Sequence, residues 1–209
     1  MQKFYEFLLI LRMAQDYAYP DRSKGSHQVK TRKLIAAALG GLVLSAHVLF
    51  AATFSIPGQG DWNLAIPPGW KVSTRLVNEP TAILLRVAPP NGDAWNVQVT
   101  GVLLKPEDAK KTTPESVRQS ALDAAKEVVS SSVEGKVNLQ DLKGKQSVGF
   151  YFSLTDKAPA PGEYKYLVQG VVLNDKLLSA FTILSHEKES SDVKQILQIL
   201  ADGTYSQSR

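Results

Sequence analysis

Apolar and polar residues alternate along the first part of the chain after residue 52, and a two-residue period of this kind is typical of half-buried strands. Clusters of Gly, Pro, Asn and Asp interrupt the alternation and indicate turns, with Asn91-Gly92 the strongest hairpin signal among them. The pattern predicts strands over 53–57, 62–67, 71–77, 82–88 and 94–104.

The period changes between residues 112 and 131. Val117, Ala121, Ala124 and Val128 recur at helical spacing and would form one narrow stripe. Thr113 stands before Pro114, and this order is favourable because threonine caps a helix start and proline fits its first turn. We therefore expect a helix over 114–130, whose small residues suit close packing on a sheet.

Strand-like segments return after this helix, over 136–142, 147–155, 163–173 and 176–185. The last two are apolar on both faces, which predicts that both sides of the sheet are covered. A closing helix is expected to begin near Ser190 and Ser191 and to end by Gly203. Its apolar stripe consists of Val193, Ile196, Leu197 and Leu200.

Short turns between successive strands favour antiparallel pairing, and the two helices need apolar surface to cover. The sequence therefore predicts an α+β fold: a mainly antiparallel β-sheet with helices packed on its faces. Residues 52–209 are long enough for one domain with its own core.

The stretch before this domain has the pattern of a secretory signal peptide. Lys30, Arg32 and Lys33 are followed by an uncharged apolar run and then by small residues, and we expect export with cleavage after Ala51. The expected leader spans 29–51. Two alternatives remain: an uncleaved inner-membrane anchor over 34–52, and a buried core helix.

Residues 1–28 precede this leader and are interpreted as a non-native or disordered extension. A valine codon can serve as a bacterial start, so translation from Val29 would give an ordinary leader. The alternative is a genuine long n-region, which could begin at Met13.

Charge and cysteine content exclude several classes of function. The chain carries a net charge of +4, but seven of its 24 Lys and Arg residues precede residue 53, against three of its 20 acidic residues. The remaining segment is neutral, so we expect no nucleic-acid partner. The absence of cysteine excludes disulfides, thiol catalysis, zinc-thiolate sites and a lipid-modified N-terminal cysteine.

The segment "FSIPGQGDWNLAIPPGWKV" (54–72) resembles the opening of PsbP-like domains, a fold shared with the Mog family of Ran-binding proteins and with bacterial periplasmic relatives of the DcrB type. Pro68, Gly69 and Trp70 carry the resemblance, together with the later order of elements. It implies an α/β/α sandwich and a binding or assembly role, because the family includes photosystem subunits, nuclear transport factors and envelope proteins rather than typical enzymes.

One cluster has residue types that can bind metal: His186, Glu187, Glu189 and Asp192. Neighbouring residues on an extended strand end point in opposite directions, so we interpret the cluster as a polar turn before a helix and predict no metal site. His186 is the sole histidine after residue 52, and no Gly-x-Ser-x-Gly elbow accompanies it. Neither a catalytic residue nor a cofactor is predicted.

Trp62, Trp70 and Trp95 are the candidate ligand or partner surface. Large aromatic residues more often pack in a core, and Trp70 after Pro-Pro-Gly would suit a packed corner, so both interpretations stay open.

These observations predict an exported, non-catalytic periplasmic binding or assembly factor of the PsbP/DcrB-like kind. Its partner would be an envelope protein or a small ligand, and it would keep no stable membrane anchor after cleavage. The alternatives are a periplasmic hydrolase with scattered carboxylates and a carrier of small apolar ligands. A carrier would need an open cavity between sheet and helix.

Overall fold

The computed structural model describes residues 50–56, 59–76, 82–88, 90, 94–188 and 190–207. The predicted leader and the extension before it therefore lie outside the described residues, except for Phe50 and Ala51. The hairpin turn predicted at Asn91-Gly92 also lies outside them. Every strand pair in the structure is antiparallel, and helices pack on the sheet, so the α+β fold class is confirmed.

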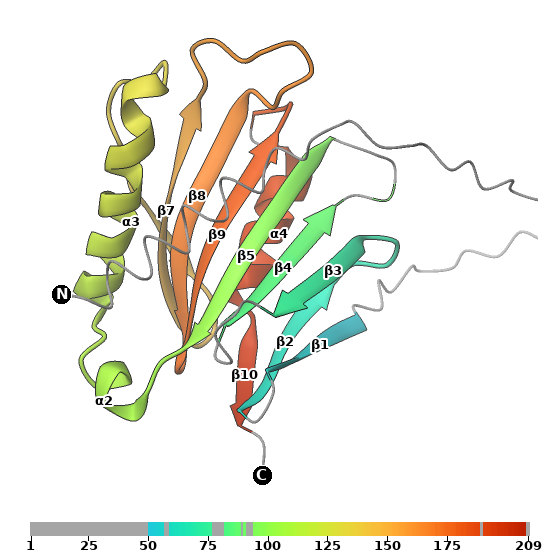
Figure 1. The fold of residues 1–209 in the computed structure, drawn as a ribbon, viewed down its shortest axis with the longest axis vertical. Helices are drawn as coiled ribbons and strands as arrows, with labels where there is room; N and C mark the ends of the chain where they lie inside the picture. The colour runs from blue at the N-terminus through green and yellow to red at the C-terminus, as the bar shows by residue number, and fades with distance from the viewer. Residues whose placement is uncertain are drawn as a thin grey trace, which may run out of the picture.

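Seven strands form the larger sheet (Figure 1). In spatial order they are β3 (Lys71–Leu76), β4 (Ala82–Ala88), β5 (Trp95–Leu103), β9 (Leu177–Ser185), β8 (Tyr166–Asn174), β7 (Ser147–Thr155) and β6 (Gln140–Lys143). The predicted strands at 82–88 and 147–155 match β4 and β7 at both ends.

A second sheet of three strands was not expected from the sequence. β2 (Gly60–Ile66) lies at its centre, between β1 (Phe50–Ile56) and β10 (Thr204–Gln207). β10 follows the closing helix and pairs with β2 although some 140 residues separate them in sequence. β1 begins at Phe50, so cleavage after Ala51 would remove two residues of this strand and leave Ala52 paired with Leu64.

The predicted middle helix is α3 (Pro114–Val128), which continues as the 3-10 turn η1 (Val129–Ser131). Thr113 caps it as expected, because its hydroxyl oxygen accepts a hydrogen bond from the Ser116 amide while the Ser116 hydroxyl oxygen accepts one from the Thr113 amide. A short additional helix, α2 (Pro106–Ala109), precedes it.

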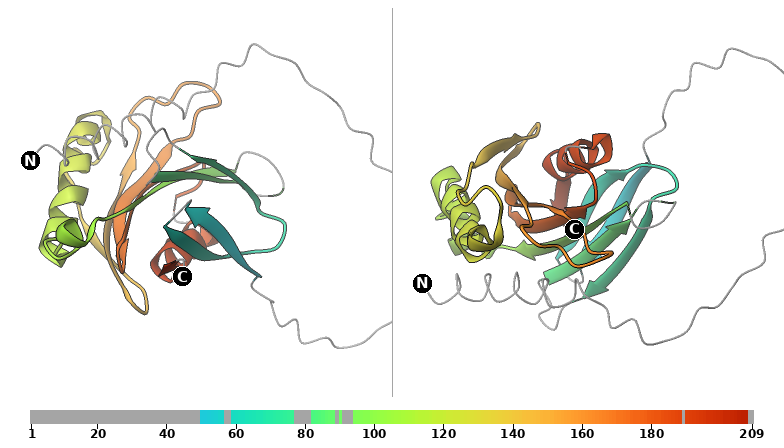
Figure 2. Two further views of the ribbon diagram at one scale, coloured as in Figure 1. Left: turned by 60° about the horizontal axis from the view of Figure 1, so that its bottom comes forward. Right: turned by 90° about the horizontal axis from the view of Figure 1, so that it is seen from above.

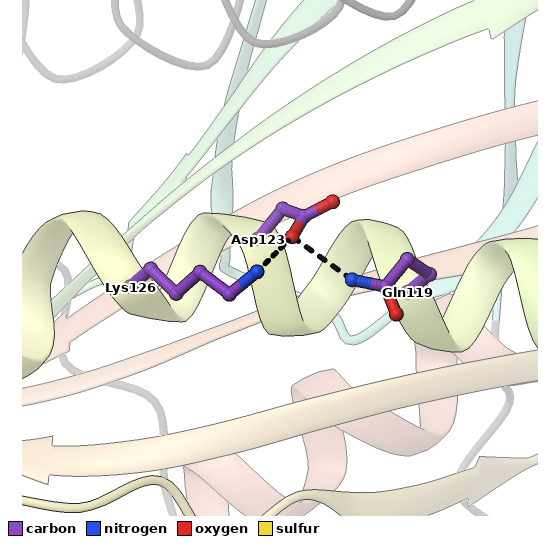
Figure 3. Close-up of polar contacts among 3 residues, drawn as sticks. All are labelled: Gln119, Asp123 and Lys126. Atoms are coloured by element: carbon purple, nitrogen blue, oxygen red, sulfur yellow. Dashed lines mark hydrogen bonds and ion pairs between the residues drawn. The ribbon is translucent and has the colours of Figure 1, made fainter.

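The outer side of α3 is polar. Asp123 accepts hydrogen bonds from Gln119 Nε2 at 2.9 Å and from Lys126 Nζ at 2.7 Å, through the same carboxylate oxygen (Figure 3). Contacts of this kind, one helical turn apart, add only a few tenths of a kcal/mol each. The helix is therefore held chiefly by its buried face.

Two apolar clusters lie on opposite faces of the larger sheet. On one face the small residues of α3 pack over β7 and β8, against Phe152, Leu154 and Val171. On the other face α4 (Ser191–Ala201) and the small sheet enclose the main core. Figure 2 shows α3 and α4 on the two sides of the sheet, so the two-sided burial predicted for β8 and β9 is confirmed.

The strand predicted over 136–142 is largely wrong, because only Gln140–Lys143 forms β6. Residues 133–139 form no strand, and Gly135 among them has a φ of +62°. Val137 and Leu139 then pack against the cluster under α3 instead of joining β7. Their apolar alternation therefore reflects burial in this cluster rather than pairing with a neighbouring strand.

Candidate functional site

The three tryptophans predicted as a surface lie at different depths. Trp62 and Trp95 are 0% and 2% exposed, so the prediction of a ligand or partner surface is wrong for these two. Both occupy strand positions that point into the core between the two sheets and α4, where a large aromatic side chain removes the most apolar area from water. Trp70 is half-buried.

Trp70 and Trp95 form a packed corner. Pro68 and Gly69 stand at the centre of a turn in which the Trp70 amide donates to the Pro67 carbonyl at 3.3 Å, and the φ of Gly69 is +84°. Proline followed by glycine suits a type II turn. The turn places the Trp70 ring edge-on to Trp95, with the ring centroids 4.6 Å apart.

Trp95 also connects the sheet to α4, because its Nε1 donates to an Asp192 carboxylate oxygen at 2.9 Å. This bond gives Asp192 a structural role at the start of the helix. His186 is exposed and its ring stacks on Tyr164 at 4.5 Å. Glu187 is exposed as well, and Glu189 lies outside the described residues. Within the described ranges, no group of three or more His, Asp or Glu side chains gathers around a point that could hold a metal ion.

A row of polar side chains crosses the α3 side of the larger sheet and was not predicted. The strand registers place Ser73, Arg86, Gln98, Thr182 and Gln169 side by side on five successive strands. Gln98 and Gln169 are 7% and 2% exposed, and their Oε1 atoms have no hydrogen-bond partner among the described residues. The sequence could not reveal this row, because it depends on registers between strands far apart in the chain.

A hollow in the described structure lies between the two sheets. It has a volume of about 330 Å³, is open to solvent, and is lined by Thr53, Phe54, Ser55, Thr74 and Ile83. We call it the edge groove. β1 is an outer strand of the small sheet and β3 is an outer strand of the larger one, so the groove separates two sheet edges.

The wall that β1 contributes is its backbone edge. Successive side chains of a strand point to opposite faces, so three consecutive residues can line one groove only if the strand presents its edge to it. Thr53, Phe54 and Ser55 are consecutive. The hydroxyls of Thr53 and Ser55 donate to Asn63 and Asp61 of β2, and are therefore already engaged within the small sheet.

The four outer strands of the two sheets differ in how they are protected against pairing. β6 and β10 have four residues each, and β6 carries Asp141 and Lys143. Short, charged edge strands discourage pairing with other chains. β1 has seven residues and no charge, and none of the described residues pairs with its outer edge. The edge groove thus lies beside the least protected strand of the fold.

A smaller apolar cavity lies between β2, β4, β5 and α4, and includes Trp70, Ile196 and Leu200 in its lining. Its volume is about 10 Å³, no more than the space that a single water molecule needs. No helix among the described residues is long and apolar enough to cross a membrane.

Nine chains of solved structures are similar to this chain, and one of them is a cyanobacterial protein. The chain is similar to the solution structure of cyanobacterial PsbP (CyanoP) from Synechocystis sp. PCC 6803, with a TM-score of 0.45 and 13% identity. The match covers 79% of this chain and 98% of that chain. No family model matches the chain, and no curated protein does so either.

The fold class itself rests on the strand order and the antiparallel registers described above.

Proposed function

We propose that this protein is an exported, non-catalytic binding or assembly factor of the PsbP/DcrB-like kind, and that it engages an envelope protein through the edge groove. The single observation that supports binding there is the open and uncharged backbone edge of β1, of which Ala52–Ile56 would remain after cleavage. Such an edge offers a line of peptide N–H and C=O groups to another chain. The leader pattern over 29–51 supports export.

The alternative of an apolar-ligand carrier needs an open cavity between sheet and helix. The cavity at that place has a volume of about 10 Å³, which is far below the several hundred Å³ of small-molecule sites. The edge groove reaches the lower end of that range. Its β1 wall is a strand edge, however, and this geometry suits a second strand better than a compact ligand.

The alternative of a hydrolase would need a nucleophile or an acid–base pair held near a pocket. The residues that line the edge groove are hydroxyl-bearing or apolar, and the hydroxyls of Thr53 and Ser55 both donate to neighbours in β2. This lining favours binding over acid–base chemistry.

Site-specific photo-crosslinking tests the proposal. A photoreactive phenylalanine analogue at Thr74, which is exposed on the groove wall, should crosslink to one envelope protein in living cells. The same analogue at Lys110, the exposed residue at the end of α2, is the matched control and should not crosslink, because α2 lies apart from β1 and β3 (Figure 1). Equal crosslinking at both positions, or none at Thr74, would contradict binding at the edge groove.

A further inference from the structure

The edge groove has two chemically different sides for any strand that enters it. Phe54 and Ile83 belong to the main core and form its apolar floor. On the opposite, outer face of β3 lie Lys71, Ser73 and Arg75, which are all exposed. A strand paired with β3 would point alternate side chains toward each of these two surfaces.

The outer face beside the groove is positively charged. Arg86 of β4 lies directly across from Ser73, with Lys71 and Arg75 at the diagonal positions of the same face. Neither β3 nor β4 contains an acidic residue. A strand added at β3 would therefore place alternate side chains within cross-strand distance of Lys71 and Arg75.

From these observations we propose that the edge groove takes an extended polypeptide segment with acidic residues at alternate positions and apolar residues between them. The segment pairs with the outer edge of β3 and lies between β3 and β1. Its acidic side chains face Lys71 and Arg75, and its apolar side chains cover Phe54 and Ile83. This inference rests on the proposed function and adds the chemistry of the partner.

The backbone groups on the outer edge of β3 favour a polypeptide over other polyanions. A strand edge presents donors and acceptors in alternation, and an extended peptide supplies the complementary groups to both. A phosphate polymer supplies acceptors only, and the headgroups of an anionic lipid surface do not repeat in register with a strand. Such partners would satisfy the cations of β3 but leave the carbonyls along the edge without donors.

The first measurement uses three fluorescent octapeptides and the purified full-length chain. One alternates glutamate and valine, one alternates lysine and valine, and one has four glutamates followed by four valines. Fluorescence anisotropy should show saturable binding of the first peptide only. Equal binding of the alternating and the blocked glutamate peptides would overturn the strand geometry, because both carry the same charge.

The second measurement reverses the charge of the outer face. Lys71→Glu together with Arg75→Glu should weaken binding of the glutamate peptide roughly tenfold or more, since each exposed ion pair contributes up to about fivefold and the new glutamates also repel the peptide. The same variant should create binding of the lysine peptide. Lys71→Glu alone is the milder variant if the double variant folds poorly. Lys110→Glu should leave both affinities unchanged, and an unaltered preference in the charge-reversed variants would overturn the proposal.

Backbone amide chemical shifts then locate the bound peptide. The proposal requires perturbations concentrated in β1 and β3, and perturbations confined to other strands would overturn it. Anionic vesicles containing phosphatidylglycerol should not displace the peptide, and displacement would favour a lipid surface instead. If Thr74 crosslinks to a partner but the alternating peptide does not bind, this inference fails while the proposed function stands.

Discussion

Single residues show where sequence patterns and three-dimensional contacts diverge. Trp95, Val97 and Val99 alternate along the strand predicted over 94–104, and all three are buried. Its bond to Asp192 could not be predicted, because it joins residues 97 positions apart. The surface role suggested for Trp62 failed for a similar reason. A tryptophan on an alternating strand can face either the solvent or the core. Trp62 lies on the central strand of the second sheet, which the unpredicted β10 completes.

Among the described acidic residues, Glu134 is the one whose pKa the fold clearly shifts. Burial alone would raise its pKa, but the Thr155 amide and hydroxyl both donate to its carboxylate at 2.8 Å, and Lys188 adds a favourable charge. Together these interactions lower the pKa of Glu134 below its ordinary value of 4.5. The ionised form therefore stabilises the folded state.

This lowered pKa predicts a specific pH dependence. The contribution of Glu134 is present above pH 4.5 and is lost as the pH falls through the lower folded-state pKa. Thermal melts at pH 7 and pH 3 should show a smaller loss of stability for Glu134→Gln than for the unaltered protein. Glu127→Gln removes an exposed carboxylate of α3 and serves as the control. If Glu134→Gln loses as much stability between pH 7 and pH 3 as the unaltered protein does, this account of the lowered pKa is contradicted.

At the scale of elements, local signals were the most reliable. Thr113 and Pro114 predict the start of α3, and the short gap between the strands predicted over 163–173 and 176–185 agrees with the hairpin of β8 and β9. Asp175 has a φ of +55°, a conformation that aspartate tolerates better than most residues. Non-local pairing was the part that failed. Nothing near residues 204–207 indicates that they complete a sheet begun at residue 50.

The cap of α3 gives a quantitative prediction. Thr113→Ala removes the acceptor for the Ser116 amide and should lower the free energy of unfolding by about 0.5–2 kcal/mol, measured by urea denaturation. Thr113→Ser keeps the hydroxyl and should retain most of the stability. Lys126→Ala, which removes an exposed contact on the same helix, should cost less than about 0.5 kcal/mol. A cost for Thr113→Ala no larger than that of Lys126→Ala would show that the cap contributes little.

At the scale of the whole molecule, the general arrangement followed from the sequence, but the edge groove did not. Two-sided burial of β8 and β9 predicted helices on both faces, and the structure has α3 and α4 there. The groove arises between two sheets, whereas the sequence suggested a single one. Its lining comes from β1, β3 and β4, and none of these residues stands out in the chain.

The expected export predicts where the mature chain begins. The leader pattern over 29–51 should direct cleavage after Ala51, so that the protein purified from its native compartment begins near Ala52. β1 would then retain Ala52–Ile56, including the three residues that line the edge groove. Intact-mass spectrometry reads the N-terminus directly. An intact chain that begins at Met1 would contradict cleavage.

The central claim is that a partner binds along the open edges of β1 and β3. Hydrogen–deuterium exchange of the purified protein, alone and with the partner captured at Thr74, tests it most directly. The account predicts slower amide exchange over Ala52–Ile56 and Lys71–Leu76, because a strand in the edge groove would occupy the free N–H groups there. Slower exchange confined to α3, β6 or the loops around His186, with β1 and β3 unchanged, would contradict the claim.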